Sequence, residues 1–165
     1  MADIKLKSGR KIIIKGGSES LQVEINVRGK ACGGCRYHTF PYKCQSPVSI
    51  NGKRPNITVR SKEDVLNIID SLILEIEEQN KDGHDFDINS SVIAQLPFFA
   101  CQNIFIDSDI QKDIKRYIYC TEIGVSPYEG HMGKHPYKWV DRFFLIKRSL
   151  ANLEKSEIQK RKNKK

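Results

Sequence analysis

Residues 31–44 have the sequence ACGGCRYHTFPYKC, and we expect the amino-terminal part of the chain to fold around this stretch. Three cysteines and a histidine lie within thirteen residues: Cys32, Cys35, His38 and Cys44. A Cys-x2-Cys turn directs two thiolates to one point, because the intervening Gly33 and Gly34 let the backbone fold tightly. His38 and Cys44 would complete a tetrahedral set of ligands. The spacing therefore predicts a structural Zn²⁺ site.

Two other interpretations of these cysteines stay open. A Cys-x2-Cys pair is also the motif of thiol oxidoreductases, although there it normally opens a helix and here Pro41 and Pro47 follow it. The thiols can also be ordinary ones that bind no metal. Disulfides are disfavoured, because residues 1–17 lack the features of a secretory signal and five cysteines leave one unpaired. We therefore expect a reducing, cytoplasmic setting.

The length and composition favour one soluble domain, with or without a small subdomain. A chain of 165 residues is long enough to bury a core, and no apolar run approaches the eighteen residues that cross a bilayer. We therefore expect no membrane contact. The sequence does not indicate an oligomeric state.

Charge is distributed unevenly and predicts three segments. Residues 1–60 hold twelve Lys or Arg against three Asp or Glu, residues 61–154 hold ten against sixteen, and residues 155–165 hold six against one. We expect a basic β-rich segment over 1–60, a helical domain over 61–154 and a basic tail over 155–165. Such alternation favours contacts with acidic partners or between opposite surfaces of the chain.

Hydrophobic periodicity predicts strands before residue 60. Residues 4–15 have the pattern of a hairpin that turns at Ser8-Gly9. Leu21, Val23, Ile25 and Val27 alternate with polar residues, which is the pattern of a half-buried strand. Ile57 and Val59 predict one more strand. The expected result is a small antiparallel sheet with the Cys/His cluster in a loop.

Helical spacing predominates after residue 60. Ser61 can cap a helix that runs to about residue 80, Asp107 or Ser108 can cap a second over 110–121, and Pro136 is suited to the first turn of a third. Cys101 and Cys120 are expected to be packing residues, and whether they join a metal site stays open. The predicted fold class is α+β, a small amino-terminal sheet followed by a helical part.

Basic residues accompany the cluster and form the tail, and they predict a nucleic-acid surface. Tyr37, Phe40 and Tyr42 lie among them and would either stack on bases or close the small core around the metal. The candidate nucleic-acid-binding residues are Lys30, Arg36, Lys43, Lys53, Arg54, Arg60, Lys160, Arg161, Lys162, Lys164 and Lys165.

Residues 117–146 have the sequence YIYCTEIGVSPYEGHMGKHPYKWVDRFFLI, in which Pro127-Tyr128, Pro136 and Trp139-Val140-Asp141 form a recognisable pattern. This pattern resembles small accessory proteins encoded among the structural and tail-assembly genes of tailed bacteriophages. Those proteins often have Asp-Gln before the second proline, where this chain has Lys134-His135. The resemblance implies a phage-encoded protein with a protein partner in virion or tail assembly, located in the host cytoplasm or the virion.

No catalytic constellation can be assigned from the sequence, and we expect no catalytic residue. Cys35 and His38 have the chemistry of a nucleophile and base, but their position on a Gly-rich loop favours metal ligation. We therefore expect a non-enzymatic, zinc-stabilised binding or assembly module. The alternatives are a nucleic-acid-binding regulator that uses the basic loop and tail, and a Cys-x2-Cys thiol oxidoreductase.

Overall fold

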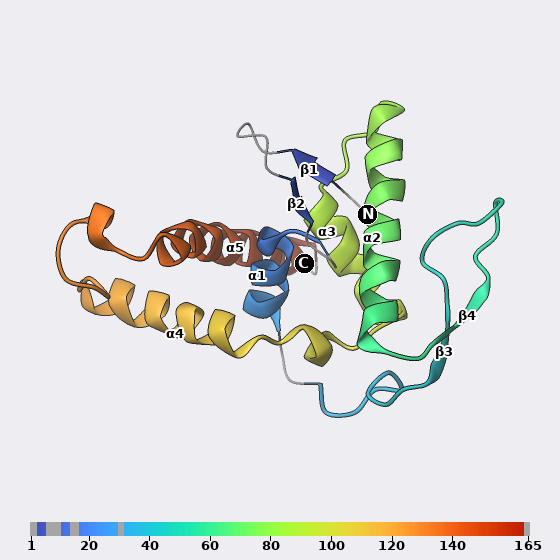
Figure 1. The fold of residues 1–165 in the computed structure, drawn as a ribbon, viewed down its shortest axis with the longest axis horizontal. Coiled ribbons are helices and arrows are strands. Elements are labelled where there is room, and N and C mark those ends of the chain that lie inside the picture. Colours follow the sequence, from blue (N-terminus) through green and yellow to red (C-terminus); the bar gives the residue numbers. More distant parts are fainter. Residues whose placement is uncertain (1–2, 6–10, 14–16, 30–31, 164–165) are drawn as a thin grey trace. The chain divides into compact units, whose positions relative to one another are not determined.

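A computed structural model of the chain (Figure 1) describes residues 3–5, 11–13, 17–29 and 32–163. The described residues form two separate two-stranded antiparallel ribbons and a larger set of helices. The predicted α+β class, a small antiparallel sheet followed by a mostly helical part, is confirmed.

The chain divides into two compact units. Unit 1 comprises residues 1–21 and 30–104, and unit 2 comprises residues 22–29 and 105–165. Helix α1 (Glu19–Arg28) contributes its first turn to unit 1 and the remainder to unit 2. Each unit is therefore built from segments that are distant in the sequence.

Unit 1 contains both ribbons. Strands β1 (Asp3–Lys5) and β2 (Lys11–Ile13) pair as the sequence predicts, with Ile4 opposite Ile12, and their expected turn at Ser8-Gly9 lies outside the described residues. Strands β3 (Tyr42–Gln45) and β4 (Asn56–Val59) pair with Lys43 opposite Thr58. In this second ribbon Tyr42, Cys44 and Val59 are buried, whereas Lys43 and Gln45 are exposed.

The strand predicted from the alternation of residues 21–28 is wrong, because this segment is helix α1. The alternating apolar and polar residues of this segment do not form a buried face and a solvent-exposed face. Glu24 and Asn26, which lie between the apolar residues, are buried as well. A segment that is buried on most sides loses the polar stripe by which helical periodicity is recognised.

Helix α2 (Lys62–Lys81) confirms the predicted helix and its cap. The hydroxyl of Ser61 accepts a hydrogen bond from the Asp64 amide at 3.2 Å, and the Asp64 carboxylate accepts one from the Arg60 amide at 2.7 Å. These bonds satisfy amides that a helix start leaves without partners. The buried stripe consists of Val65, Ile69, Leu72, Ile73 and Ile76.

A series of short helical turns follows α2 and completes unit 1. Helix α3 (Ile88–Gln95) starts at Asp87, whose side chain accepts a hydrogen bond from the Ser90 amide at 2.7 Å. The 3-10 helix η1 (Leu96–Phe98) continues directly from α3, and η2 (Gln102–Phe105) follows. Phe99, Ala100 and Cys101 connect the two turns and are buried.

Unit 2 is built on helices α4 (Ser108–Ile123) and α5 (Tyr137–Lys162). The 3-10 turn η3 (Met132–Lys134) lies between them in the sequence, just before α5. Asp107 caps α4 by accepting hydrogen bonds from the amides of Asp109 and Ile110. These amides hold the pKa of Asp107 below its usual range.

Helix α5 runs through much of the expected tail. The core cluster consists of Val23, Ile110, Ile114 and Ile146, with Val27, Tyr117, Leu145 and Leu150 packed against it.

Asn26 joins α1 to the start of α4 within unit 2. Its amide nitrogen donates to the carbonyl oxygens of Gln22 (2.9 Å) and Phe105 (3.0 Å). Its oxygen accepts from the Asp107 amide (2.9 Å) and from Gln111 Nε2 (3.2 Å). Because both ends of this buried amide are satisfied, its burial costs little and fixes the orientation of α1.

None of the helices among the described residues combines the length and the apolar character that crossing a bilayer requires.

Replacing Asn26 with Ala should lower the free energy of unfolding of unit 2 by about 2–4 kcal/mol, because buried groups of Phe105 and Asp107 lose their partner. Urea unfolding followed by fluorescence of Trp139, the only tryptophan in the chain, measures this unit. Asn152→Ala, at an exposed position of α5, should change the free energy by less than about 0.5 kcal/mol. Equal effects of both substitutions would contradict the assigned role of Asn26.

Candidate metal centre

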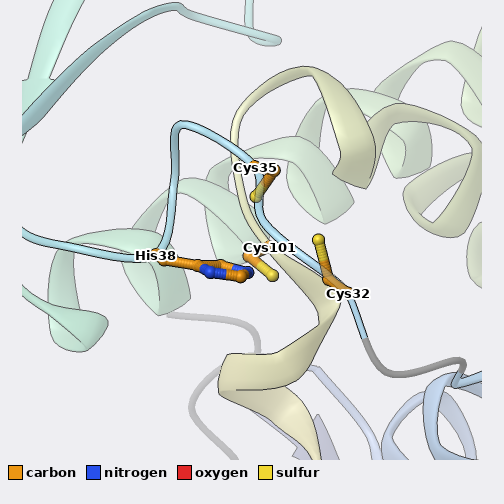
Figure 2. Close-up of side chains that lie close together, drawn as sticks. All are labelled: Cys32, Cys35, His38 and Cys101. Carbon is orange, nitrogen blue, oxygen red and sulfur yellow. The ribbon is translucent and has the colours of Figure 1, made fainter.

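Four side chains of unit 1 converge on one point. The sulfur atoms of Cys32, Cys35 and Cys101 and a ring nitrogen of His38 all lie within 4.8 Å of one another. Figure 2 shows that three of these residues belong to one loop, whereas Cys101 comes from a separate segment and faces them. A tetrahedral zinc ion with Zn–S bonds of about 2.3 Å requires ligand atoms about 3.8 Å apart. The group needs only a small contraction to reach that geometry.

The structure places Cys101, rather than the expected Cys44, with the other three residues. Cys44 lies on β3 opposite Ile57, and strand alternation turns its side chain to the buried face of the ribbon. Burial raises the pKa of the Cys44 thiol. Cys120, His131 and His135 also lie outside the group, and the described residues contain no second group of this kind.

Asn103 holds the loop against the segment that contains Cys101. Its side-chain oxygen accepts a hydrogen bond from the Cys32 amide at 3.0 Å, and its nitrogen donates to the Cys32 carbonyl at 3.4 Å. One side chain therefore bonds both backbone groups of a residue 71 positions away. Because Asn103 is two residues from Cys101, this contact holds Cys32 close to Cys101.

Two buried tyrosines attach the other end of the loop to the same segment. The hydroxyl of Tyr37 donates to the Phe98 carbonyl at 2.6 Å, and that of Tyr42 donates to the Phe99 carbonyl at 3.0 Å. The two rings pack with centroids 4.9 Å apart. Burial raises the pKa of Tyr42, which keeps its hydroxyl protonated as a donor. The backbone just before Cys101 is thereby fixed from both sides.

The thiols of this group differ in their electrostatic environment. A hydrogen bond from the Gly34 backbone, with smaller contributions from His38 and Cys35, lowers the pKa of Cys32 to about 7. Gly34 has φ +146°, a conformation that residues with side chains rarely adopt, so the loop depends on glycine here. Burial raises the pKa of Cys101 to about 11. Cys32 thus supplies a thiolate most readily, and a bound cation would be needed to ionise Cys101 at neutral pH.

The candidate nucleic-acid-binding residues do not form one described set. Lys30, Lys164 and Lys165 lie outside the described residues, and the others are exposed. They are divided between unit 1 (Arg36, Lys43, Lys53, Arg54 and Arg60) and unit 2 (Lys160, Arg161 and Lys162).

Of the two interpretations of Tyr37 and Tyr42, closure of the small core agrees with the structure, because both rings are buried and are not available to stack on bases. Phe40, which is half-buried, stacks on Tyr42 with centroids 5.4 Å apart.

Sequence reasoning assigned Cys101 to packing because nothing in its local sequence marks a ligand. It follows Phe99-Ala100 in an apolar stretch, and the Cys-x2-Cys-x2-His pattern lies about sixty residues earlier. The sequence indicated only that Cys101 and Cys120 remained as further thiols beside the three cysteines of the expected site. Asn103 had no sequence signal at all.

No family model matches the chain, and the comparisons with curated proteins and with solved structures gave no significant match. The site is therefore interpreted from its own geometry.

Replacing Asn103 with Ala should weaken zinc retention by about tenfold, because the loop loses the side chain that orients Cys32. Competition with a chromophoric chelator measures this affinity. The neighbouring Gln102→Ala serves as the control and should leave retention unchanged. Similar affinities for wild type and Asn103→Ala would show that the Asn103 contact does not support the site.

In chelator-treated native protein, alkylation of Cys32 should increase as the pH rises through about 7, because the thiolate is the reactive form. Cys101 should react only at much higher pH. Mass spectrometry after a short iodoacetamide pulse gives the rate at each cysteine. In urea the thiols should titrate together near their ordinary value of about 8.5. A native Cys32 midpoint at that value would show that the Gly34 backbone hydrogen bond does not lower the pKa of this thiol.

Proposed function

We propose that this chain is a non-enzymatic binding module in which a structural zinc ion fixes the loop that contains Cys32, Cys35 and His38. The observation that supports it most directly is the approach of Cys101 to those three residues, within 4.8 Å. The four candidate ligands come from two segments of the chain, residues 32–38 and residue 101, and both lie outside the helices and strands. A zinc ion would fix the loop over residues 32–41, in which no helix or strand holds the backbone.

The ligand set favours zinc over other common metals. Three thiolates and an imidazole suit zinc, whereas calcium and magnesium prefer oxygen ligands. A set of four protein ligands also leaves no position for water or substrate, which is typical of structural zinc sites and not of catalytic ones. The role proposed for the ion is therefore mechanical.

A second candidate, a thiol oxidoreductase, is favoured by one observation. Cys32 is half-exposed and has a pKa of about 7, which are properties of reactive cysteines. Zinc ligation and redox activity make different demands on the same sulfurs. Bound zinc would protect the thiols, and protein purified without chelator distinguishes the two candidates.

The proposed biological setting is the assembly of a larger structure with a protein partner. The resemblance of residues 117–146 to phage accessory proteins supports this setting, and it stays a prediction. Capsid and tail genes beside the gene for this protein would support it further.

Substitution of Cys101 with Ala tests the metal site, and Cys44→Ala is a matched control because both thiols are buried. Wild type and Cys44→Ala should contain about one zinc per chain by elemental analysis, whereas Cys101→Ala should lose most of its zinc to a mild chelator. Both variants should lose similar packing energy, so the difference between them reports ligation.

Three outcomes would count against the proposal. Zinc loss in Cys44→Ala but not in Cys101→Ala would return the fourth ligand to Cys44. Wild-type protein without zinc and with readily alkylated Cys32 and Cys35 would favour the redox candidate. Chelation without any change in the thermal unfolding of unit 1 would show that a bound ion is not structural.

A further inference from the structure

Unit 1 contains a cleft of about 380 Å³ between the β3–β4 ribbon and the turn η1. Its lining combines an aromatic ring, two amides and one guanidinium: Gln45, Ser46, Pro47, Arg54, Gln95 and Phe98. None of these residues is acidic. The chemistry of the lining therefore favours a ligand that has a flat ring, hydrogen-bonding groups and negative charge.

Phe98 is the least expected feature of this cleft, because 71% of its surface is exposed. Its neighbour Phe99 is completely buried, so the chain here has the apolar core that it needs. The Phe98 carbonyl accepts the hydrogen bond from Tyr37, which fixes the backbone under the exposed ring. An exposed ring on a fixed backbone is suited to stacking, because little conformational entropy is lost when a ligand binds.

The surface beside the cleft is basic. No Asp or Glu occurs between Lys30 and Arg60. Lys43 and Gln45 lie on the same exposed face of β3, and Arg54 lies in the connection between β3 and β4. Lys43 and Arg54 supply positive charge that the phosphates of a nucleic-acid strand would meet.

The cleft lining contains no Asp or Glu, although two acidic side chains bond backbone amides near the ribbon. Asp64 accepts from the Arg60 amide, and Glu75 accepts from the Ser49 amide at 3.4 Å. Arg36 bonds the Tyr37 hydroxyl. Lys43, Lys53 and Arg54 are exposed cations of the β3–β4 ribbon and its connection.

The two amides give the cleft the capacity to bond a base edge. Gln45 Nε2 donates to the Arg54 carbonyl at 3.3 Å, which holds this side chain at the cleft wall. Gln95 lies on the opposite side, at the end of α3. An amide offers both donor and acceptor, as the edges of nucleobases require.

We propose that this cleft binds an unpaired nucleotide of a single-stranded nucleic acid, with its base stacked on Phe98 and its phosphates against Lys43 and Arg54. This inference names a partner for the module. It rests on the proposed function, because the proposed zinc ion would bind Cys101, three residues after Phe98, and so fix the backbone that carries the Phe98 ring. An acidic peptide would satisfy the charges but would leave the ring and the amides unused. A duplex would not offer an unstacked base.

Fluorescence anisotropy of a labelled single-stranded oligonucleotide of about 12 nucleotides, as DNA and as RNA, tests the inference. Phe98→Ala should weaken binding by about 5- to 100-fold, the effect of losing one base–aromatic stack. Phe86→Ala, which removes an exposed ring elsewhere in unit 1, is the matched control and should bind like wild type. Because Phe98 is exposed, its replacement should not disturb folding.

Salt dependence tests the charges separately. Arg54→Gln and Lys43→Gln should each weaken binding and reduce the slope of log affinity against log salt by about 0.7, the value for one phosphate contact on a single strand. Binding to the DNA strand or to the RNA strand supports the site, and the tighter of the two identifies the sugar that it prefers.

Three results would overturn the inference: equal affinity of wild type and Phe98→Ala, equal affinity for duplex and single strand, or competition by polyglutamate as effective as by unlabelled oligonucleotide. Zinc content measured in the same samples separates this inference from the proposed function. Zinc-bound protein insensitive to Phe98→Ala would remove the cleft site alone. Zinc-free protein whose binding still depends on Phe98 would remove the metal site alone.

Discussion

The structure of unit 1 depends on the attachment of an irregular loop to a segment far along the chain. Residues 32–41 contain no helix or strand, so their backbone has no ladder of hydrogen bonds to hold it. Tyr37, Tyr42 and Asn103 provide the attachment through side-chain bonds to backbone groups. Each bond contributes modestly, about 1 kcal/mol. Their joint effect is geometric, because they bring Cys101 to the three ligands of the loop and limit how the chain can close around an ion.

Unit 2 uses a buried polar residue for the same purpose. Asn26 lies on a helix whose apolar neighbours would accept several orientations against α4, since dispersion and burial are not directional. The four hydrogen bonds of its amide are directional and select one of them. A further buried contact acts similarly, as Arg142 donates to Asp113 at 2.8 Å and connects α5 to α4. Both units therefore combine nonspecific burial with a few fully satisfied polar contacts that define the arrangement.

In the proposed function, the candidate metal centre and the cleft have different tasks within unit 1. The four candidate ligands lie within 4.8 Å of one another, and a set of four protein ligands is typical of a structural zinc site. The cleft presents an exposed ring and cations to solvent, as a surface for recognition requires. Tyr37 connects the two, because it directly precedes the candidate ligand His38 while its hydroxyl donates to the Phe98 carbonyl. A zinc ion that fixed the loop would therefore also restrain the cleft, through the hydrogen bond from the Tyr37 hydroxyl to the Phe98 carbonyl.

The sequence alone determined the features that depend on near neighbours. Ser61 and Asp107 predicted helix starts, since capping is an interaction over three residues, and Cys32, Cys35 and His38 predicted a metal group from one turn of chain. Tertiary structure decided the rest. Residues 19–28 form a helix that the sequence pattern did not predict, because Glu24 and Asn26 are buried and no polar stripe marks its exposed side. Cys101, and not Cys44, lies with the other candidate ligands, because strand pairing turns Cys44 into the core. Contacts across seventy residues leave no periodic trace in sequence, because they are specified by the packing of distant segments and not by local spacing.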